Sequence, residues 1–133
     1  MAPDQSLLDT FEKIYQYFDR RDFTEQSWAQ MMDPVLDDNV KMKRLDDDGY
    51  HEGKAAIQAY FVHGNGKKDL ASWTIRNRDF QVVGGIGFVS GAADFVDTTT
   101  TSPPSRPRSI AYSFAFSKGT GVWKAIHLWG RYV

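Results

Sequence analysis

Two polar side chains on neighbouring predicted strands are the strongest candidates for chemistry in this sequence. Asp94 lies in the stretch VSGAADFVDT, on the strand parity shared with Ile86 and Phe88. Because alternate residues of a strand face the same side of a sheet, we expect Asp94 on a mostly apolar face. A desolvated carboxylate is suited to proton transfer. Tyr112, on the next strand, could polarise a substrate oxygen by donating a hydrogen bond.

The alternative for Asp94 is an ordinary surface carboxylate. Asp94 stands near the predicted end of its strand, where it would be exposed or paired with Arg108 or Lys124. Aspartate side chains are mostly exposed in folded proteins. The residues leave both interpretations open.

Other kinds of chemistry find little support. The three histidines, His51, His63 and His127, lack the spacing of metal ligands, so we expect neither a metal nor another cofactor. The absence of cysteine excludes disulfides and thiolate catalysis. With 16 basic and 17 acidic residues the net charge is -1, and there is no basic stripe of the kind that binds nucleic acid.

The chain is expected to form one domain over residues 1–133. Its N-terminal residues show no basic segment followed by an apolar stretch, which a signal peptide would need. Its apolar runs are too short to cross a bilayer, so no membrane partner is expected. These features predict a cytoplasmic protein.

Three helices are predicted in the first half of the chain and four long strands in the second. Apolar residues recur every three or four positions over Leu7–Phe18, and shorter helical patterns follow over Phe23–Met32 and Gly53–His63. A short hairpin with the turn Asp46–Gly49 precedes the third helix. Alternating patterns predict strands at Ser72–Val83, Ile86–Thr98, Arg108–Ser117 and Val122–Tyr132. This order predicts an α+β fold with helices packed on one sheet.

The last strand is apolar on both of its faces. One parity holds Val122, Ile126 and Leu128, and the other holds Trp123, His127 and Trp129. A three-residue turn before the strand would place the first set inside, with Leu128 opposite Tyr112. A two-residue turn would place the second set inside, because a slip of one residue exchanges the faces.

Several stretches of the sequence have counterparts in a known superfamily. FDRRDF, HEGKAAIQAYF and GVWKAIHL, together with the order of the elements, resemble the nuclear transport factor two-like (SnoaL-like) superfamily over nearly the whole chain. MMDPVL and SRPRS bring the chain nearest to the association-domain branch of calcium/calmodulin-dependent kinase II. The resemblance implies a cone-shaped barrel, in which a curved antiparallel sheet wraps on three N-terminal helices. It also favours the three-residue turn.

In such a cone the resemblance implies a pocket for a small apolar molecule, with a packed aromatic core as the competing interpretation. Asp94 and Tyr112 would be its catalytic groups. Its other lining residues would be Ile14, Phe18, Trp28, Met42, Ile57, Asn77, Phe88, Phe114, Ile126 and Leu128. The base of the steroid isomerase branch is replaced by Met42, and the cations of the association-domain pocket have no counterpart here. An anion is therefore not expected inside the cone.

The outer face of the closing strand would then carry Trp123, His127, Trp129 and Arg131. Interfaces are enriched in tryptophan and arginine, so we expect a homodimer through this face. Two functions stay open. One is a cofactor-independent lyase, isomerase or cyclase acting on an apolar carbonyl-bearing substrate. The other is a non-catalytic ligand-binding or dimerising association module.

Overall fold

The structure, a computed structural model, describes residues 5–20, 23–43, 50–63, 70–97, 106–119 and 121–132. Its helical elements are α1 (Gln5–Arg20), α2 (Glu25–Ser27), the π-helix η1 (Trp28–Met32), the 3-10 helix η2 (Asp33–Val35), α3 (Lys54–Gln58) and the π-helix η3 (Ala59–His63). Its strands are β1 (Leu36–Lys43), β2 (Tyr50–Glu52), β3 (Leu70–Val83), β4 (Ile86–Asp97), β5 (Arg106–Ser117) and β6 (Lys124–Tyr132). The predicted helices and long strands are confirmed, while the turn Asp46–Gly49 lies outside the described residues.

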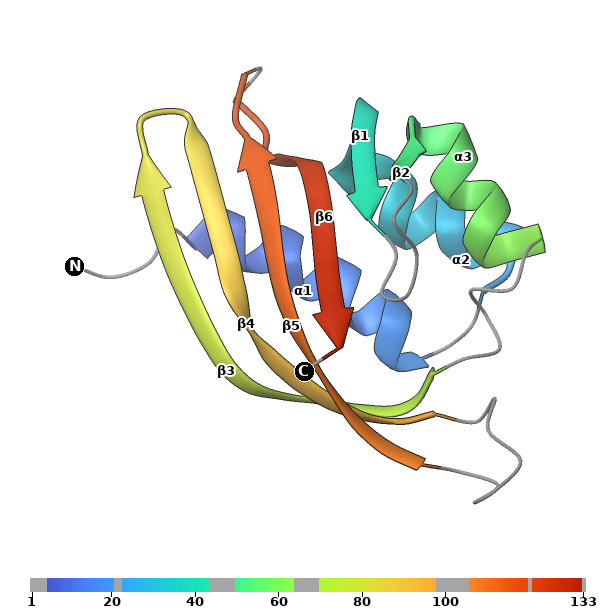
Figure 1. Cartoon of the computed structure of the whole chain (residues 1–133). Helices are drawn as coiled ribbons and strands as arrows, with labels where there is room; N and C mark the ends of the chain where they lie inside the picture. Colours follow the sequence, from blue (N-terminus) through green and yellow to red (C-terminus); the bar gives the residue numbers. More distant parts are fainter. Residues whose placement is uncertain are drawn as a thin grey trace.

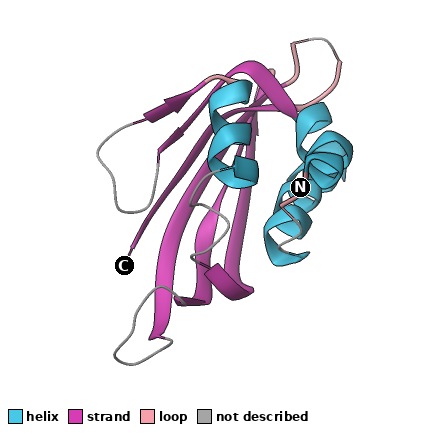
Figure 2. Ribbon diagram, turned by 90° about the vertical axis from the view of Figure 1, so that its right-hand side faces the viewer, coloured by secondary structure: helices cyan, strands magenta, loops and turns pink. Residues whose placement is uncertain are grey.

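The strands form one six-stranded sheet in the order β2-β1-β6-β5-β4-β3. The α+β class is thereby confirmed, with α1 lying across one side of the curved strands β3 to β5 and α3 beside β1 (Figures 1 and 2). Two details differ from the expected antiparallel barrel. The sheet is open, with β2 and β3 as its described edges, and β1 runs parallel to β6. No tight turn joins β1 to β6, so nothing forces that pair to be antiparallel.

The amphipathic face of α1 packs on the concave side of this sheet. Its buried residues are Leu7, Phe11, Ile14 and Tyr17. The ring of Phe11 lies 6.1 Å from that of Phe80 on β3. It lies 6.0 Å and 5.9 Å from the rings of Tyr112 and Phe114 on β5. Helix α1 and the inner face of the sheet therefore share one aromatic core. None of the described helices has the length and apolarity needed to cross a membrane.

Strand β6 contains one extra residue relative to β5. Phe116 pairs with Ala125, whereas its neighbour Ala115 pairs with His127. Ile126 is therefore left between two paired positions as a β-bulge. Such a bulge reverses the alternation of side chains, so the strand presents opposite parities to the core before and after it.

The bulge makes each of the two interpretations of β6 correct for part of the strand. Trp123 and Ala125 face the core before the bulge, and Leu128 faces it afterwards, with exposures of 2%, 0% and 2%. Leu128 pairs with Phe114, so the expected register opposite Tyr112 is wrong by two residues. Val122, expected inside, is 57% exposed because it precedes the strand.

Gly87 on β4 faces Leu7 of α1 and Trp123, which immediately precedes β6. A Cβ atom there would lie 2.8 Å from Leu7 Cδ2 and 3.2 Å from Trp123 Cζ3. Leu7 and Trp123 are both buried, so neither side chain has free space into which to move. The absence of a side chain at this position allows the helix to lie against the strand.

We expect Gly87→Ala to lower the free energy of unfolding by about 1 kcal/mol, because the added methyl group overpacks the core. Gly85→Ala is the matched control, since a Cβ atom at Gly85 would meet nothing within 4 Å. Urea unfolding of both variants measures the difference. Equal stability of the two variants would show that the core accommodates the added methyl group without a loss of stability.

Candidate functional site

Asp94 lies on the outer face of the sheet. Its neighbour Ala93 is fully buried on the inner face, so Asp94 points to the opposite side. Asp94 pairs with Ser109 on β5, and the Ser109 hydroxyl donates a 2.6 Å hydrogen bond to Asp94 Oδ1. The carboxylate is half-buried and held by a side chain of the same outer face.

Tyr112 lies on the inner face, within the aromatic core. It is 5% exposed, and its ring stacks on that of Phe11 with an interplanar angle of 17°. Burial raises the pKa of its phenol to about 12, an effect that Arg78 partly opposes. The hydroxyl therefore stays protonated at neutral pH and can act as a hydrogen-bond donor.

Asp94 does share a face with Phe88, but this face is the outer one of the sheet, so the expected place of both residues inside the cone is wrong. Val89 and Ala93 are fully buried, whereas Phe88 is 39% exposed. Over residues 86–93 both parities of β4 are free of charge, and the larger side chains lie on the outer one. The inner parity carries small residues because α1 lies close against it. Asp94 and Tyr112 are consequently on opposite faces and do not meet in one pocket.

Most of the other predicted lining residues do come together inside. Five of them belong to the buried core: Ile14, Trp28, Met42, Ile57 and Leu128. Phe18 and Phe114 pack against this core and are partly buried. Phe88 is a correction, because it lies on the outer face. Ile126 is half-buried at the bulge, between the inward-facing Ala125 and the outward-facing His127. Asn77 pairs with Ala92 through its backbone, and its side chain lies outside the described part of the structure. The small apolar ligand stays a prediction.

The residues predicted to share the outer face of the closing strand also lie on two different faces. Trp123 is buried in the core, so its assignment to the outer face is wrong, and the bulge at Ile126 is the reason. His127 and Trp129 are half-buried on the outer face, and Arg131 is exposed with its guanidinium 6.0 Å from the Trp129 ring. Burial, followed by the charge of Lys41, lowers the pKa of His127.

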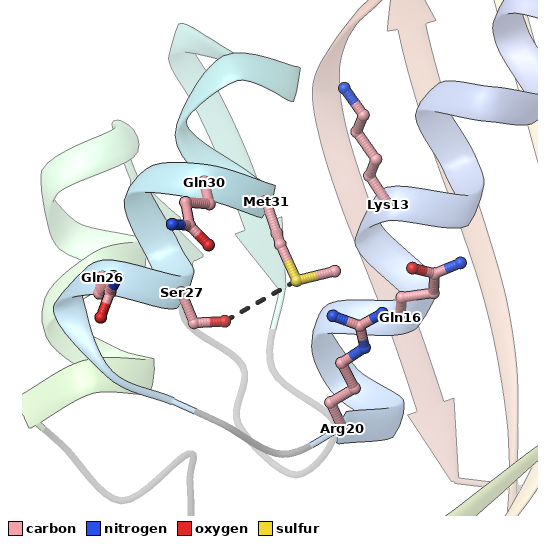
Figure 3. A pocket seen from close by; sticks show the side chains of 7 residues that line it. All are labelled: Lys13, Gln16, Arg20, Gln26, Ser27, Gln30 and Met31. Carbon is pink, nitrogen blue, oxygen red and sulfur yellow. Dashed lines mark hydrogen bonds between the residues drawn. The ribbon is translucent and has the colours of Figure 1, made fainter.

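A polar groove, which the sequence pattern does not reveal, lies between α1 and the α2–η1 segment. Its volume is about 440 Å³. Figure 3 shows its two walls: Lys13, Gln16 and Arg20 on α1, and Gln26, Ser27, Gln30 and Met31 on α2–η1. The polar stripe of α1 is visible in the sequence, but only the packing of the two helices shows that it forms a groove. No group of three or more possible metal ligands occurs among the described residues.

Comparison with known proteins places this geometry in a known fold. No family model matches the sequence, and no characterised protein matches it. A structure of the S. rosetta CaMKII hub matches with a TM-score of 0.75 and 14% identity, over 100% of this chain and 98% of that one. An NTF2-like protein from Cytophaga hutchinsonii matches with a TM-score of 0.74 and 13% identity over 100% of both chains.

A ketosteroid isomerase-like protein from Erwinia carotovora matches with a TM-score of 0.71 and 12% identity, over 94% of this chain and 92% of that one. The chain has the NTF2-like fold. The predicted resemblance is thus confirmed at the level of the fold. Because this fold serves unrelated functions, the likeness does not decide the activity.

The buried phenol of Tyr112 predicts a loss of stability at alkaline pH. Its pKa is about 12 in the folded protein, against 10.0 for an ordinary tyrosine. The unfolded chain therefore releases this proton first, and stability falls as the pH rises above about 10. We expect Tyr112→Phe to reduce the stability lost between about pH 9.5 and 11. Urea unfolding at the two pH values tests this, and an unchanged loss in the variant would contradict it.

Proposed function

We propose that this chain is a non-catalytic association module that forms a homodimer through the outer face of its sheet. The observation that carries the proposal is the composition of that face on β4, β5 and β6. Its large side chains, Phe88 on β4 and His127 and Trp129 on β6, lie on two sides of a centre of small residues. The small residues are Ser90, Ala92, Ala111, Ser113 and Ala115.

A face of this kind suits the packing of one sheet on another. Facing sheets pack about 10 Å apart, which requires small or interdigitating side chains at the centre of contact. In the single chain Phe88 is 39% exposed, and Trp129 and His127 are only half-buried. Contiguous aromatic surface is uncommon on a monomer and is enriched at interfaces.

The charges of this face favour a second copy of the same chain as the partner. Its β3–β4 side carries Asp79 and Asp94, and its β6 side carries Lys124 and Arg131. A two-fold axis that lies in the interface and runs parallel to the strands would bring the acidic side of each copy to the basic side of the other. The surface is therefore complementary to itself in charge.

Two further findings support association over catalysis. Asp94 and Tyr112, the pair expected to transfer protons together, lie on opposite faces of the sheet. The Asp94 carboxylate is already bonded by Ser109 on the face assigned to the partner. The likeness in fold to a protein named as a hub is consistent with the same role.

A charge placed at Phe88 should dissociate the dimer. We expect light scattering to give a dimer mass for the wild-type chain. Phe88→Lys should weaken association by about 30-fold or more, equivalent to about 2 kcal/mol, because it places two unpaired charges in the interface. Phe88 is not part of the buried core, so the monomer should fold normally.

Val122→Lys is the control for this experiment. Val122 is 57% exposed and precedes β6, so it is an equally drastic change outside the proposed contact. This variant should remain dimeric. A wild-type chain that is monomeric at high concentration would contradict the proposal, as would a Phe88→Lys variant that retains the wild-type mass.

His127 predicts a loss of stability on acidification. Burial and Lys41 lower its pKa from the usual 6.5, so the unfolded chain binds the proton more readily as the pH falls. Stability should therefore decrease from about pH 7.5 to 5.5, and His127→Gln should reduce that decrease. Urea unfolding at both pH values measures it, with His63→Gln as the control on α3–η3. An equal decrease in His127→Gln and in the wild type would rule out His127 as its source.

A further inference from the structure

We propose that the groove between α1 and the α2–η1 segment is a binding site for a small polar oxyanion, a phosphate or carboxylate compound. This site is separate from the interior of the cone. It is also independent of the proposed dimer, because it lies on the helical side of the sheet, away from the outer face (Figures 2 and 3).

The first wall of the groove is a stripe of α1. Lys13, Gln16 and Arg20 lie at spacings of three and four residues, so they share one side of the helix. The opposite stripe, which includes Phe11 and Ile14, is buried in the core. The polar wall therefore has a fixed position, because the apolar face anchors the helix.

The second wall is formed by α2 and η1. Gln26 and Gln30 present amides along it, and Met31 lies beside them. Ser27 is 7% exposed, and its hydroxyl donates to the sulfur of Met31 at 3.8 Å, which is a weak acceptor. Trp28–Met32 is a π-helix, a rare conformation that occurs frequently at functional sites.

The charge of the groove points to an anion. Lys13 and Arg20 are its only charged lining residues in the described part of the chain, and no carboxylate is among them. Two other cations of the helical and inner side have acidic partners. Arg78 pairs with Glu12, and Lys54 lies 3.4 Å from Asp33. No such ion pair is found for Lys13 or Arg20 among the described residues.

The chemistry of the lining specifies the ligand class further. Arginine binds carboxylate or phosphate oxygens through two parallel N–H donors, and lysine adds a compact charge. Three glutamine amides can each donate to and accept from hydroxyl or amide groups of a ligand. Lys13 and Arg20 are seven residues apart, a rise of about 10 Å along the helix. The volume of about 440 Å³ suits a small molecule.

The binding experiment uses the full chain and two probes in separate titrations, glycerol 3-phosphate for the phosphate arm and glutarate for the carboxylate arm. Two-dimensional NMR at low salt follows the side-chain amides of Gln16, Gln26 and Gln30. We expect saturable shifts of these amides with at least one probe. The probe that binds identifies which oxyanion the groove prefers.

Arg20→Gln and Lys13→Gln remove one charge each without removing the polar wall. We expect each to weaken binding by about tenfold, because a charge-assisted hydrogen bond is lost. Lys118→Gln is the control, since it removes the same charge away from the groove. The Lys118 Nζ atom lies over the Trp123 ring, 5.4 Å from its centroid. This variant should bind as the wild type does.

Two outcomes would overturn the proposal. One is the absence of glutamine amide shifts with both probes up to about 10 mM, which corresponds to less than about 3 kcal/mol of binding. The other is an equal loss of binding in Arg20→Gln and Lys118→Gln, which would show that net charge, and not the groove, attracts the anion. The NMR spectrum of each variant reports its folding in the same experiment.

Discussion

The packing of α1 on the concave side of the sheet is the contact on which the rest of the structure depends. Phe11 meets aromatic rings of both β3 and β5, and Leu7 lies where a side chain at Gly87 would be. A helix that lies this close requires small residues on the facing strand. This requirement for small side chains opposite α1 decides which face of β4 is inner.

The bulge in β6 serves the same core. Trp123, Ala125 and Leu128 all reach the core, although a regular strand would turn them to different sides. The extra residue at Ile126 resolves this conflict by reversing the alternation. The strand thereby fills the core along its length and leaves His127 and Trp129 on the outer face. That face becomes a surface suited to a second sheet.

The two sides of the domain carry surfaces with different chemistry. The outer face of the sheet is aromatic at its margins, acidic on one side and basic on the other. The groove on the helical side is polar, concave and positive. An association surface and a small-ligand site can therefore coexist in one small domain, because the hydrophobic core lies between them.

The sequence by itself determined the elements, their order and the α+β class, because apolar periodicity is a local property of the chain. It also identified most of the core, including Ile14, Trp28 and Ile57. Only the tertiary structure decided the faces of β4 and β6. Both parities of these strands are compatible with burial, and a single bulge or a close helix changes the choice. The side on which Asp94 lies and the groove beside Arg20 both depend on how distant elements pack, so the sequence pattern alone does not reveal them.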